Sequence, residues 1–279
     1  MSAATGTIVV TGASSGIGRA TALRLAARGH RVLAGVRRDA DGQALVAQDA
    51  AIEPIVLDVT DPAHVAALGE RVAGTPLTGV VNNAGIAVAG PLEAVPLDEL
   101  RRQYEVNVFG QIAVTQAVLP AVRAGVGRIV NIGSIGGRVA TPFIGPYSSS
   151  KGAVRNLTAV LRRELAPWGI HVALVEPGAI ATPIWTKGEE GADATIAALS
   201  PQASKLYARQ LDALRAATRR IAASAVPPER AVEAIEHALT ARRPRTLYTV
   251  GTDARVQAAL HAALPARVFD ALIARAMRL

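Results

Sequence analysis

Two side chains of complementary chemistry, Tyr147 and Lys151, lie four residues apart in the middle of the chain. On a helix this spacing places both on one face. A free tyrosine has a pKa of about 10, and a nearby ammonium lowers that pKa because its charge stabilises the phenolate. The pair therefore predicts a phenol that acts as a general acid and base, although the same spacing also occurs on ordinary helices.

Other polar positions fall where they could serve the same chemistry. Ser134 lies just after a strand-like run, 129–132. Ligands bind at the carboxyl ends of parallel strands, so its hydroxyl could hold a carbonyl oxygen. Asn107 lies inside a helical stretch, where asparagine is unfavourable unless its side chain makes a compensating contact. The segment Asn82–Gly85 ends another apolar run and points to the same edge.

A glycine-rich turn follows the first apolar run, with the sequence Thr11-Gly12-Ala13-Ser14-Ser15-Gly16-Ile17-Gly18. Glycines allow a tight turn and a close approach to a pyrophosphate, and the following helix offers free N–H groups. The candidate dinucleotide ligands are Gly12, Ser14, Ser15, Gly16, Ile17 and Gly18. The spacing Gly-x-x-x-Gly-x-Gly differs from the commoner Gly-x-Gly-x-x-Gly, and a plain tight turn is the alternative.

The end of the second apolar run indicates which dinucleotide is bound. An acidic residue there would bind the ribose 2′-hydroxyl of NAD, but this chain has Val36 followed by Arg37 and Arg38. Guanidinium groups bind a 2′-phosphate through charge-assisted hydrogen bonds. The pair therefore predicts NADP(H), with ordinary surface arginines as the alternative. Asp58 ends the third run, where it could accept from an adenine amino group or begin a helix.

These residues need a scaffold that brings distant strand ends together. Short runs that are apolar on both faces occur at 8–10, 32–34, 55–57, 80–81, 128–130, 171–175 and 247–250. Helical windows lie between them at 16–28, 61–73, 97–124 and 147–165. Strands buried on both faces and joined by helices are typical of parallel sheets. The pattern predicts an α/β fold with a doubly wound, Rossmann-type parallel sheet, in a single domain spanning 1–279.

The alternation breaks at 184–226. Its first part, Lys187–Gly191, is polar and contains glycine, and an amphipathic helix is expected over 193–222. We expect this insertion to be a mobile lid over a substrate. The tail, 256–279, is expected to be helical with an apolar stripe around Val268 and Leu272. It would pack on the protein or on a second subunit, or lie on a membrane surface.

Charge and composition exclude several classes of protein. The 279-residue chain has a net charge of +8 and no cysteine, so disulfides and thiolate metal sites are excluded, and no metal is expected. Scattered arginines favour a solvated basic surface over nucleic-acid binding. We expect no signal peptide at the start of this sequence, and it has no long uncharged apolar stretch. We therefore expect a cytoplasmic protein without stable membrane insertion.

Together these motifs resemble the short-chain dehydrogenase/reductase family. The matching elements follow the family's order and spacing: Thr11–Gly18, Asp58, Asn82–Gly85, Asn107, Ser134, Tyr147, Lys151 and Pro177-Gly178 with Thr182. The segment Pro244–Ala254 is more weakly similar to the hydroxysteroid- and retinol-dehydrogenase-like branch, which suggests a bulky, apolar substrate. The resemblance implies a seven-stranded sheet and hydride transfer between NADP(H) and a carbonyl or secondary-alcohol carbon, with homodimers or homotetramers as the expected assembly.

The resemblance also implies a catalytic tetrad. Tyr147 would donate a proton to the carbonyl oxygen, which Ser134 would hold. Lys151 would bind the nicotinamide ribose and lower the tyrosine pKa, and Asn107 would anchor a proton-relaying water. Tyr147 and Lys151 would also contact the cofactor, together with Val59, Asn83, Ala84, Gly85, Pro177, Gly178, Ile180 and Thr182. The substrate would be lined by Ser134, Ile135, Gly136, Phe143, Tyr147 and Trp185.

Two other functions are open at this point. A ketoacyl-carrier-protein reductase would need a basic patch near the entrance for its acidic partner, and the apolar character of 184–226 argues against it. A non-catalytic NADP(H)-sensing regulator would be expected to lack Tyr147 or Lys151, and both are present.

Overall fold

The centre of the molecule is a parallel sheet of seven strands in the order β3-β2-β1-β4-β5-β6-β7. The computed structural model describes residues 5–186, 188, 190 and 200–277. The strands are β1 (Thr7–Val10), β2 (Arg31–Val36), β3 (Ile52–Val56), β4 (Leu77–Asn82), β5 (Arg128–Ile132), β6 (His171–Pro177) and β7 (Leu247–Val250). The doubly wound, Rossmann-type sheet predicted from the sequence is confirmed, with β3 beginning three residues earlier than expected.

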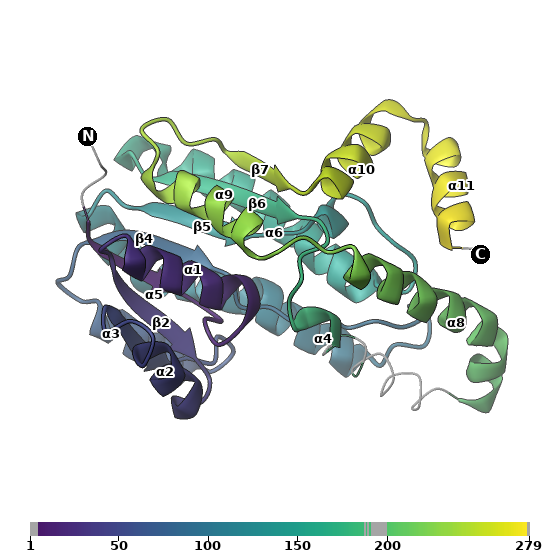
Figure 1. The fold of residues 1–279 in the computed structure, drawn as a ribbon, viewed down its shortest axis with the longest axis horizontal. Coiled ribbons are helices and arrows are strands. Elements are labelled where there is room, and N and C mark those ends of the chain that lie inside the picture. The colour runs from purple at the N-terminus through teal and green to yellow at the C-terminus, as the bar shows by residue number, and fades with distance from the viewer. Residues whose placement is uncertain (1–4, 187, 189, 191–199, 278–279) are drawn as a thin grey trace.

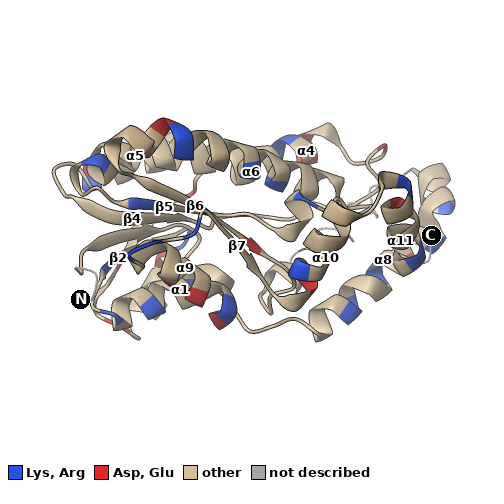
Figure 2. Cartoon of the chain, turned by 90° about the horizontal axis from the view of Figure 1, so that it is seen from above, with Lys and Arg blue, Asp and Glu red and all other residues tan. Residues whose placement is uncertain are grey.

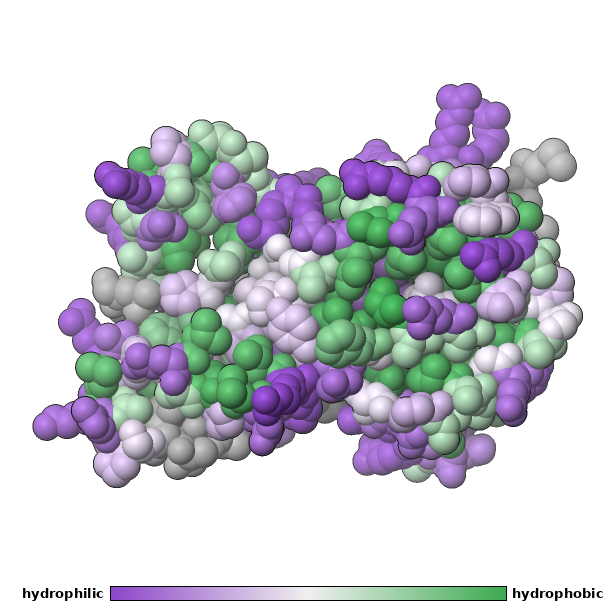
Figure 3. Space-filling view, turned by 180° about the vertical axis from the view of Figure 1, so that it is seen from behind, coloured by the Kyte–Doolittle hydropathy of each residue, from purple (hydrophilic) through white to green (hydrophobic). Residues whose placement is uncertain are grey.

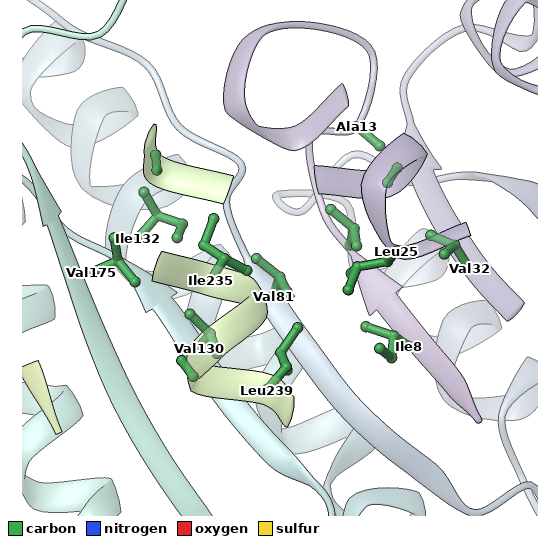
Figure 4. Packing of buried hydrophobic residues seen from close by; sticks show 14 of the residues in the cluster. Ile8, Ala13, Leu25, Val32, Val81, Val130, Ile132, Val175, Ile235 and Leu239 are labelled. Atoms are coloured by element: carbon green, nitrogen blue, oxygen red, sulfur yellow. The ribbon is translucent and has the colours of Figure 1, made fainter. Parts of the chain in front are cut away.

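Helices cover both faces of this sheet (Figures 1 and 2). One face carries α1 (Gly16–Ala27), α2 (Asp39–Val46) and α9 (Glu229–Thr240), and the other carries α3 (Pro62–Arg71), α5 (Gly110–Ala124) and α6 (Gly145–Leu165). On the first face, Leu25 of α1 lies beside Ile8 and Val32, and Ile235 of α9 lies beside Val81 and Val130 (Figure 4). The inner strands are thus buried on both sides, which is why their apolar runs were recognisable, whereas the edge strands β3 and β7 are only partly buried.

The order of the strands fixes where a ligand can bind. The strands β1 and β4 are direct neighbours, and the sheet continues from them in opposite directions. At such a switch point the loops beyond the carboxyl ends of the two strands diverge and leave a crevice. The glycine-rich turn follows β1 and the Asn83–Gly85 segment follows β4, so both lie at this switch point.

The predicted helical window 97–124 is not one α-helix. It consists of α4 (Leu97–Tyr104), a π-helical turn, η1 (Glu105–Phe109), and α5. The expected tail helix 256–279 is likewise two helices, α10 (Thr252–Ala263) and α11 (Ala266–Met277). Pro265 separates them because the residue before a proline avoids helical geometry, and Leu264 is extended at φ −97° and ψ 143°.

The insertion and the tail lie at the same end of the molecule, beyond the carboxyl ends of the strands (Figures 1 and 2). The insertion contains α8 (Pro201–Ala223), and α11 contacts it. Most of the polar segment 187–193 lies outside the described residues, but Gly188 and Glu190 are helical, which the sequence did not predict. No helix in the described part of the chain is long and apolar enough to cross a membrane.

Candidate active site

The tyrosine–lysine pair lies on α6, as its spacing predicted. The helix begins at Gly145 with Pro146 in its first turn, where a proline costs no hydrogen bond. Lys151 is only 6% exposed, and its Nζ donates to the backbone oxygen of Ile132 at 2.8 Å. The same Nζ is 5.9 Å from the centre of the Tyr147 ring. The lysine thus reaches from the helix to the end of β5, beside the phenol.

Burial determines the ionisation of this pair. Loss of hydration lowers the pKa of Lys151 to about 8. Burial raises the pKa of Tyr147 above its ordinary value, and the hydrogen bond with Ser134 acts in the opposite direction. The lowered tyrosine pKa that was expected beside Lys151 is therefore not found, because burial outweighs the effects that favour the phenolate. Tyr147 is a protonated phenol at neutral pH, which suits it to donate a proton.

Ser134 reaches the same place from the end of β5. It begins the short 3₁₀ turn η2 (Ile135–Gly137), and its Oγ accepts from the Gly136 amide at 3.0 Å. A Cβ built on Gly136 would lie 3.4 Å from Ser134 Oγ and 3.5 Å from Tyr147 Cε1. The serine hydroxyl and the phenol ring therefore border one small space, as the predicted substrate-oxygen site requires.

Asn107 is buried in the π-helical turn and its amide is well partnered. Its Oδ1 accepts from the Ile86 amide at 2.9 Å, and its Nδ2 donates to the Ile86 oxygen and to Ser150 Oγ, both at 3.1 Å. These contacts explain why asparagine is tolerated inside the helix. A Cβ on Gly85 would lie 3.2 Å from Asn107 Oδ1 and 3.6 Å from Lys151 Nζ. The structure thus brings all four tetrad candidates to one edge.

The glycine-rich turn is braced from the next strand. Thr11 Oγ1 accepts from the amides of Asn83 and Ala84, each at 2.9 Å, and Asn83 Nδ2 donates to the oxygens of Thr11 and Gly12 at 3.0 and 3.2 Å. The Asn83 side chain therefore supports the turn. Ser15 precedes α1 without a side-chain cap, so the helix's first N–H groups remain available for a phosphate.

The Pro177–Thr182 segment, which begins at the end of β6, packs against the glycine-rich turn. Gly16 has a φ of +55°, and a Cβ there would lie 3.0 Å from the Thr182 side chain. Only glycine fits this conformation and approach. Trp185 Nε1 donates to the Ile180 oxygen at 2.6 Å, so the start of the insertion folds back on the segment. Ile180 itself is buried in the core, which leaves only its backbone for a ligand.

Arg37 and Arg38, which follow β2, have different partners. Arg38 binds Asp41 through Nε and Nη2 at 2.9 and 2.7 Å, whereas Arg37 lies near Asp58. Burial alone would raise the pKa of Asp58, but hydrogen bonds from Thr60 and the charges of Arg37 and His64 lower it below its usual value. Arg37 is therefore the better phosphate candidate. The Val59 side chain is buried in the core.

The expected substrate residues meet the insertion and the tail. Phe143 has a φ of +68°, a strained conformation for a bulky residue, and its ring contacts Tyr207 of α8 edge-on at 6.0 Å. Tyr207 Oη donates to Glu93 at 2.7 Å. Ile135 packs with Phe269 of α11 in a separate apolar cluster. The insertion thus contacts Phe143, and the tail packs against Ile135, which follows Ser134 in the sequence.

Sequence reasoning missed several residues that hold this site. Gln103 is buried and binds the backbone of Ile86 and Val88. Asp253 of α10 accepts from the Ala179 amide at 2.8 Å and so ties the tail to the Pro177–Thr182 segment. Glu176 joins two arginines directly before Pro177. Each acts on a segment distant in sequence, so no local spacing revealed it.

Comparison with known proteins places these features in context. A family model described as short chain dehydrogenase matches residues 6–193. Mouse retinol dehydrogenase 5 is 38% identical over 95% of this chain and 87% of its own. An NADPH-dependent 3-dehydrocapnine reductase from Ornithobacterium rhinotracheale is 36% identical over 94% of each. A short chain dehydrogenase from Burkholderia cenocepacia, solved with NADP, has a TM-score of 0.75 and 29% identity over 99% of each chain.

Proposed function

Because this chain belongs to the short-chain dehydrogenase/reductase family, we propose that it is an NADP(H)-dependent oxidoreductase acting on the carbonyl or secondary alcohol of an apolar small molecule. The observation that carries this proposal is the convergence of Ser134, Tyr147 and Lys151 at the carboxyl edge of β5. These three side chains come from a strand end and a helix, and they border one space next to the crevice between β1 and β4.

Each residue of the site would have a separate role in carbonyl reduction. When bound, the dinucleotide supplies the hydride that the carbonyl carbon gains. Ser134 donates a hydrogen bond to the carbonyl oxygen, and Tyr147 gives that oxygen its proton. Lys151, charged below a pKa of about 8, stabilises the phenolate that remains. Asn107 Oδ1 accepts one backbone bond and keeps a second lone pair for a water that returns the proton.

The crevice suits NADP(H). The glycine-rich turn and the uncapped start of α1 would hold the pyrophosphate, Asp58 the adenosine, Arg37 the 2′-phosphate, and the Pro177–Thr182 segment the nicotinamide. No carboxylate stands at Val36 to repel a phosphate. An NADPH-dependent relative and a similar structure solved with NADP support the same choice.

An apolar substrate fits the walls of the site. Phe143 contacts Tyr207 of the insertion, and Ile135, which follows Ser134 in the sequence, packs with Phe269 of the tail. Retinol dehydrogenase 5, one of the relatives, is named for a substrate of this character. We propose that the insertion 184–226 is the lid over this substrate.

One observation favours a second candidate, a ketoacyl-carrier-protein-type reductase. The insertion is less apolar than the sequence pattern suggested, because α8 carries Lys205, Arg209, Arg215, Arg219 and Arg220 against a single acidic residue, Asp212. A basic helix beside the site could receive an acidic carrier protein. Carrier-bound substrates would then be reduced faster than free ketones, with a rate that falls steeply with salt.

A panel of apolar ketones and aldehydes, with a carrier-bound ketoacyl substrate alongside, tests the proposal. Consumption of NADPH is followed by the absorbance of the reduced nicotinamide, and NADH is tested in parallel. We expect reduction of apolar ketones with NADPH. A protein that binds NADPH but turns over none of these substrates in either direction would be the non-catalytic sensor.

A further inference from the structure

Glu176 is a buried carboxylate outside the recognised motifs. It is the next-to-last residue of β6, and its side chain is 1% exposed. Its Oε2 accepts from Arg138 Nη2 at 2.7 Å, and its Oε1 is bound by Arg155 Nη1. Since the two oxygens bind different arginines, one side chain joins three segments of the chain.

Each of these segments carries part of the proposed site. Arg138 follows η2, four residues after Ser134, and Arg155 lies on α6, one helical turn after Lys151. Glu176 itself directly precedes the Pro177–Thr182 segment. The turn and the helix are already in close contact here, because a Cβ on Gly137 would lie 2.6 Å from the Lys151 carbonyl. The ion group therefore sits where the three segments meet.

Such a group is poorly explained by stability alone. Burying a carboxylate with two guanidinium groups removes water from all of them, and their mutual attraction offsets only part of that free-energy cost. Within the described residues, Arg138 Nε is also buried without a hydrogen-bond partner. What the group does provide is fixed geometry, because none of the three segments can shift without breaking at least one of the two ion pairs of the buried Glu176 carboxylate.

We propose that Glu176 is a positioning residue, which sets Ser134, the Tyr147–Lys151 pair and the Pro177–Thr182 segment at their working separations. Its kinetic consequences rest on the proposed function, whereas its structural consequences do not. Removing the carboxylate should let the three segments move relative to one another, and reacting groups displaced by about an ångström lose large factors in rate.

Glu236 offers a matched control. It also bridges two arginines, Arg24 at 2.8 Å and Arg28 at 2.7 Å, but it does so between α1 and α9, away from Ser134 and Tyr147. Glu176→Gln and Glu236→Gln each remove one carboxylate from an arginine pair. For both variants and the wild type, the measurements are thermal unfolding, hydrogen exchange, and steady-state kinetics with varied NADPH.

Both variants should unfold at lower temperature. Only Glu176→Gln should speed hydrogen exchange in all three segments and lower kcat by about 10- to 100-fold. The KM for NADPH should change less, because the substitution does not touch the glycine-rich turn. An unchanged kcat, or exchange that changes no more than in Glu236→Gln, overturns the proposal.

Two further outcomes are covered by the design of the test. If Glu176→Gln does not fold, Arg155→Lys is measured in its place. This variant retains the charge but not the planar fork, and compared with Glu236→Gln it should show the same changes in exchange and kcat. If the wild type reduces no carbonyl compound, the proposed function fails, and the exchange comparison alone still decides whether Glu176 holds the three segments together.

Discussion

Tyr147 is the residue on which the proposed reaction most depends. Replacing it with phenylalanine removes the hydroxyl that carries the transferable proton and keeps the ring that borders Ser134. General acid catalysis contributes about 10²–10⁴-fold, so Tyr147→Phe should lose that much in kcat while NADPH affinity, measured by fluorescence titration, stays near that of the wild type. A variant that kept most of its activity would remove Tyr147 from the role of acid.

Lys151 should make the activity sensitive to pH. Its pKa is lowered to about 8, so the free enzyme carries the ammonium below that pH and loses it above. The kcat/KM for NADPH should therefore be level below pH 8 and fall as the pH rises through it, since kcat/KM reports ionisations of the free enzyme. In Lys151→Arg the charge persists, so any residual activity should not show this fall. A wild-type profile that is flat to pH 10 would contradict the assignment.

Arg37 should determine the preference for NADPH. Hydrogen bonds to charged groups contribute roughly 1.5–3 kcal/mol, which corresponds to about 10- to 150-fold in kcat/KM for NADPH over NADH. Arg37→Ala should lose most of this preference with little effect on NADH. Arg38→Ala is the control, because Arg38 is already bound to Asp41. Equal use of both cofactors by the wild type would contradict the argument.

The individual residues also show where sequence reasoning ends. The four-residue spacing predicted that Tyr147 and Lys151 share a helix face, and the resemblance to a known family added Ser134 to the pair. The pKa of Tyr147 was not predictable, because it depends on burial by segments distant in sequence. Glu176 and Asp253 were missed for the same reason, since their partners lie on other elements.

Among the elements, the buried strands were the most predictable. Their runs are apolar on both faces, so the sheet was recognisable before its neighbours were known. The helix α2 was not predicted, because it is short and contains Gly42 and two aspartates. The π-helical turn at Asn107 was also missed, since its geometry depends on contacts with Ile86 and Ser150 that follow only from the fold.

The proposed lid is tested at the contact between α8 and the loop before α6. Tyr207→Phe keeps the ring against Phe143 but removes the hydrogen bond to Glu93. Exchange in 201–223 should become faster, and the KM for a bulky ketone should rise by a larger factor than kcat falls. In the wild type, exchange there should slow when NADPH and a substrate analogue bind together. Exchange that is already slow and unaffected by ligands would refute the lid.

On the scale of the whole molecule, the surface is basic but not uniformly polar. Lysines and arginines are spread over many helices (Figure 2), whereas the face formed by α5 and α6 carries exposed apolar side chains (Figure 3). Phe109, just before α5, is 56% exposed, and Val160 of α6 is 44% exposed. Contiguous apolar surface of this kind marks interaction sites in soluble proteins.

We therefore expect two copies of the chain to associate through α5 and α6. A two-fold interface uses the same patch on both subunits, and this face offers two neighbouring helices with exposed apolar side chains for that purpose. Phe109→Glu combined with Val160→Glu should give a monomer by light scattering coupled to gel filtration, since like charges would meet across the axis. Val268→Glu, which alters a 47% exposed valine on α11, should remain dimeric. If only Val268→Glu dissociates the dimer, the tail is the interface instead, and a wild type that is monomeric at micromolar concentration would exclude both arrangements.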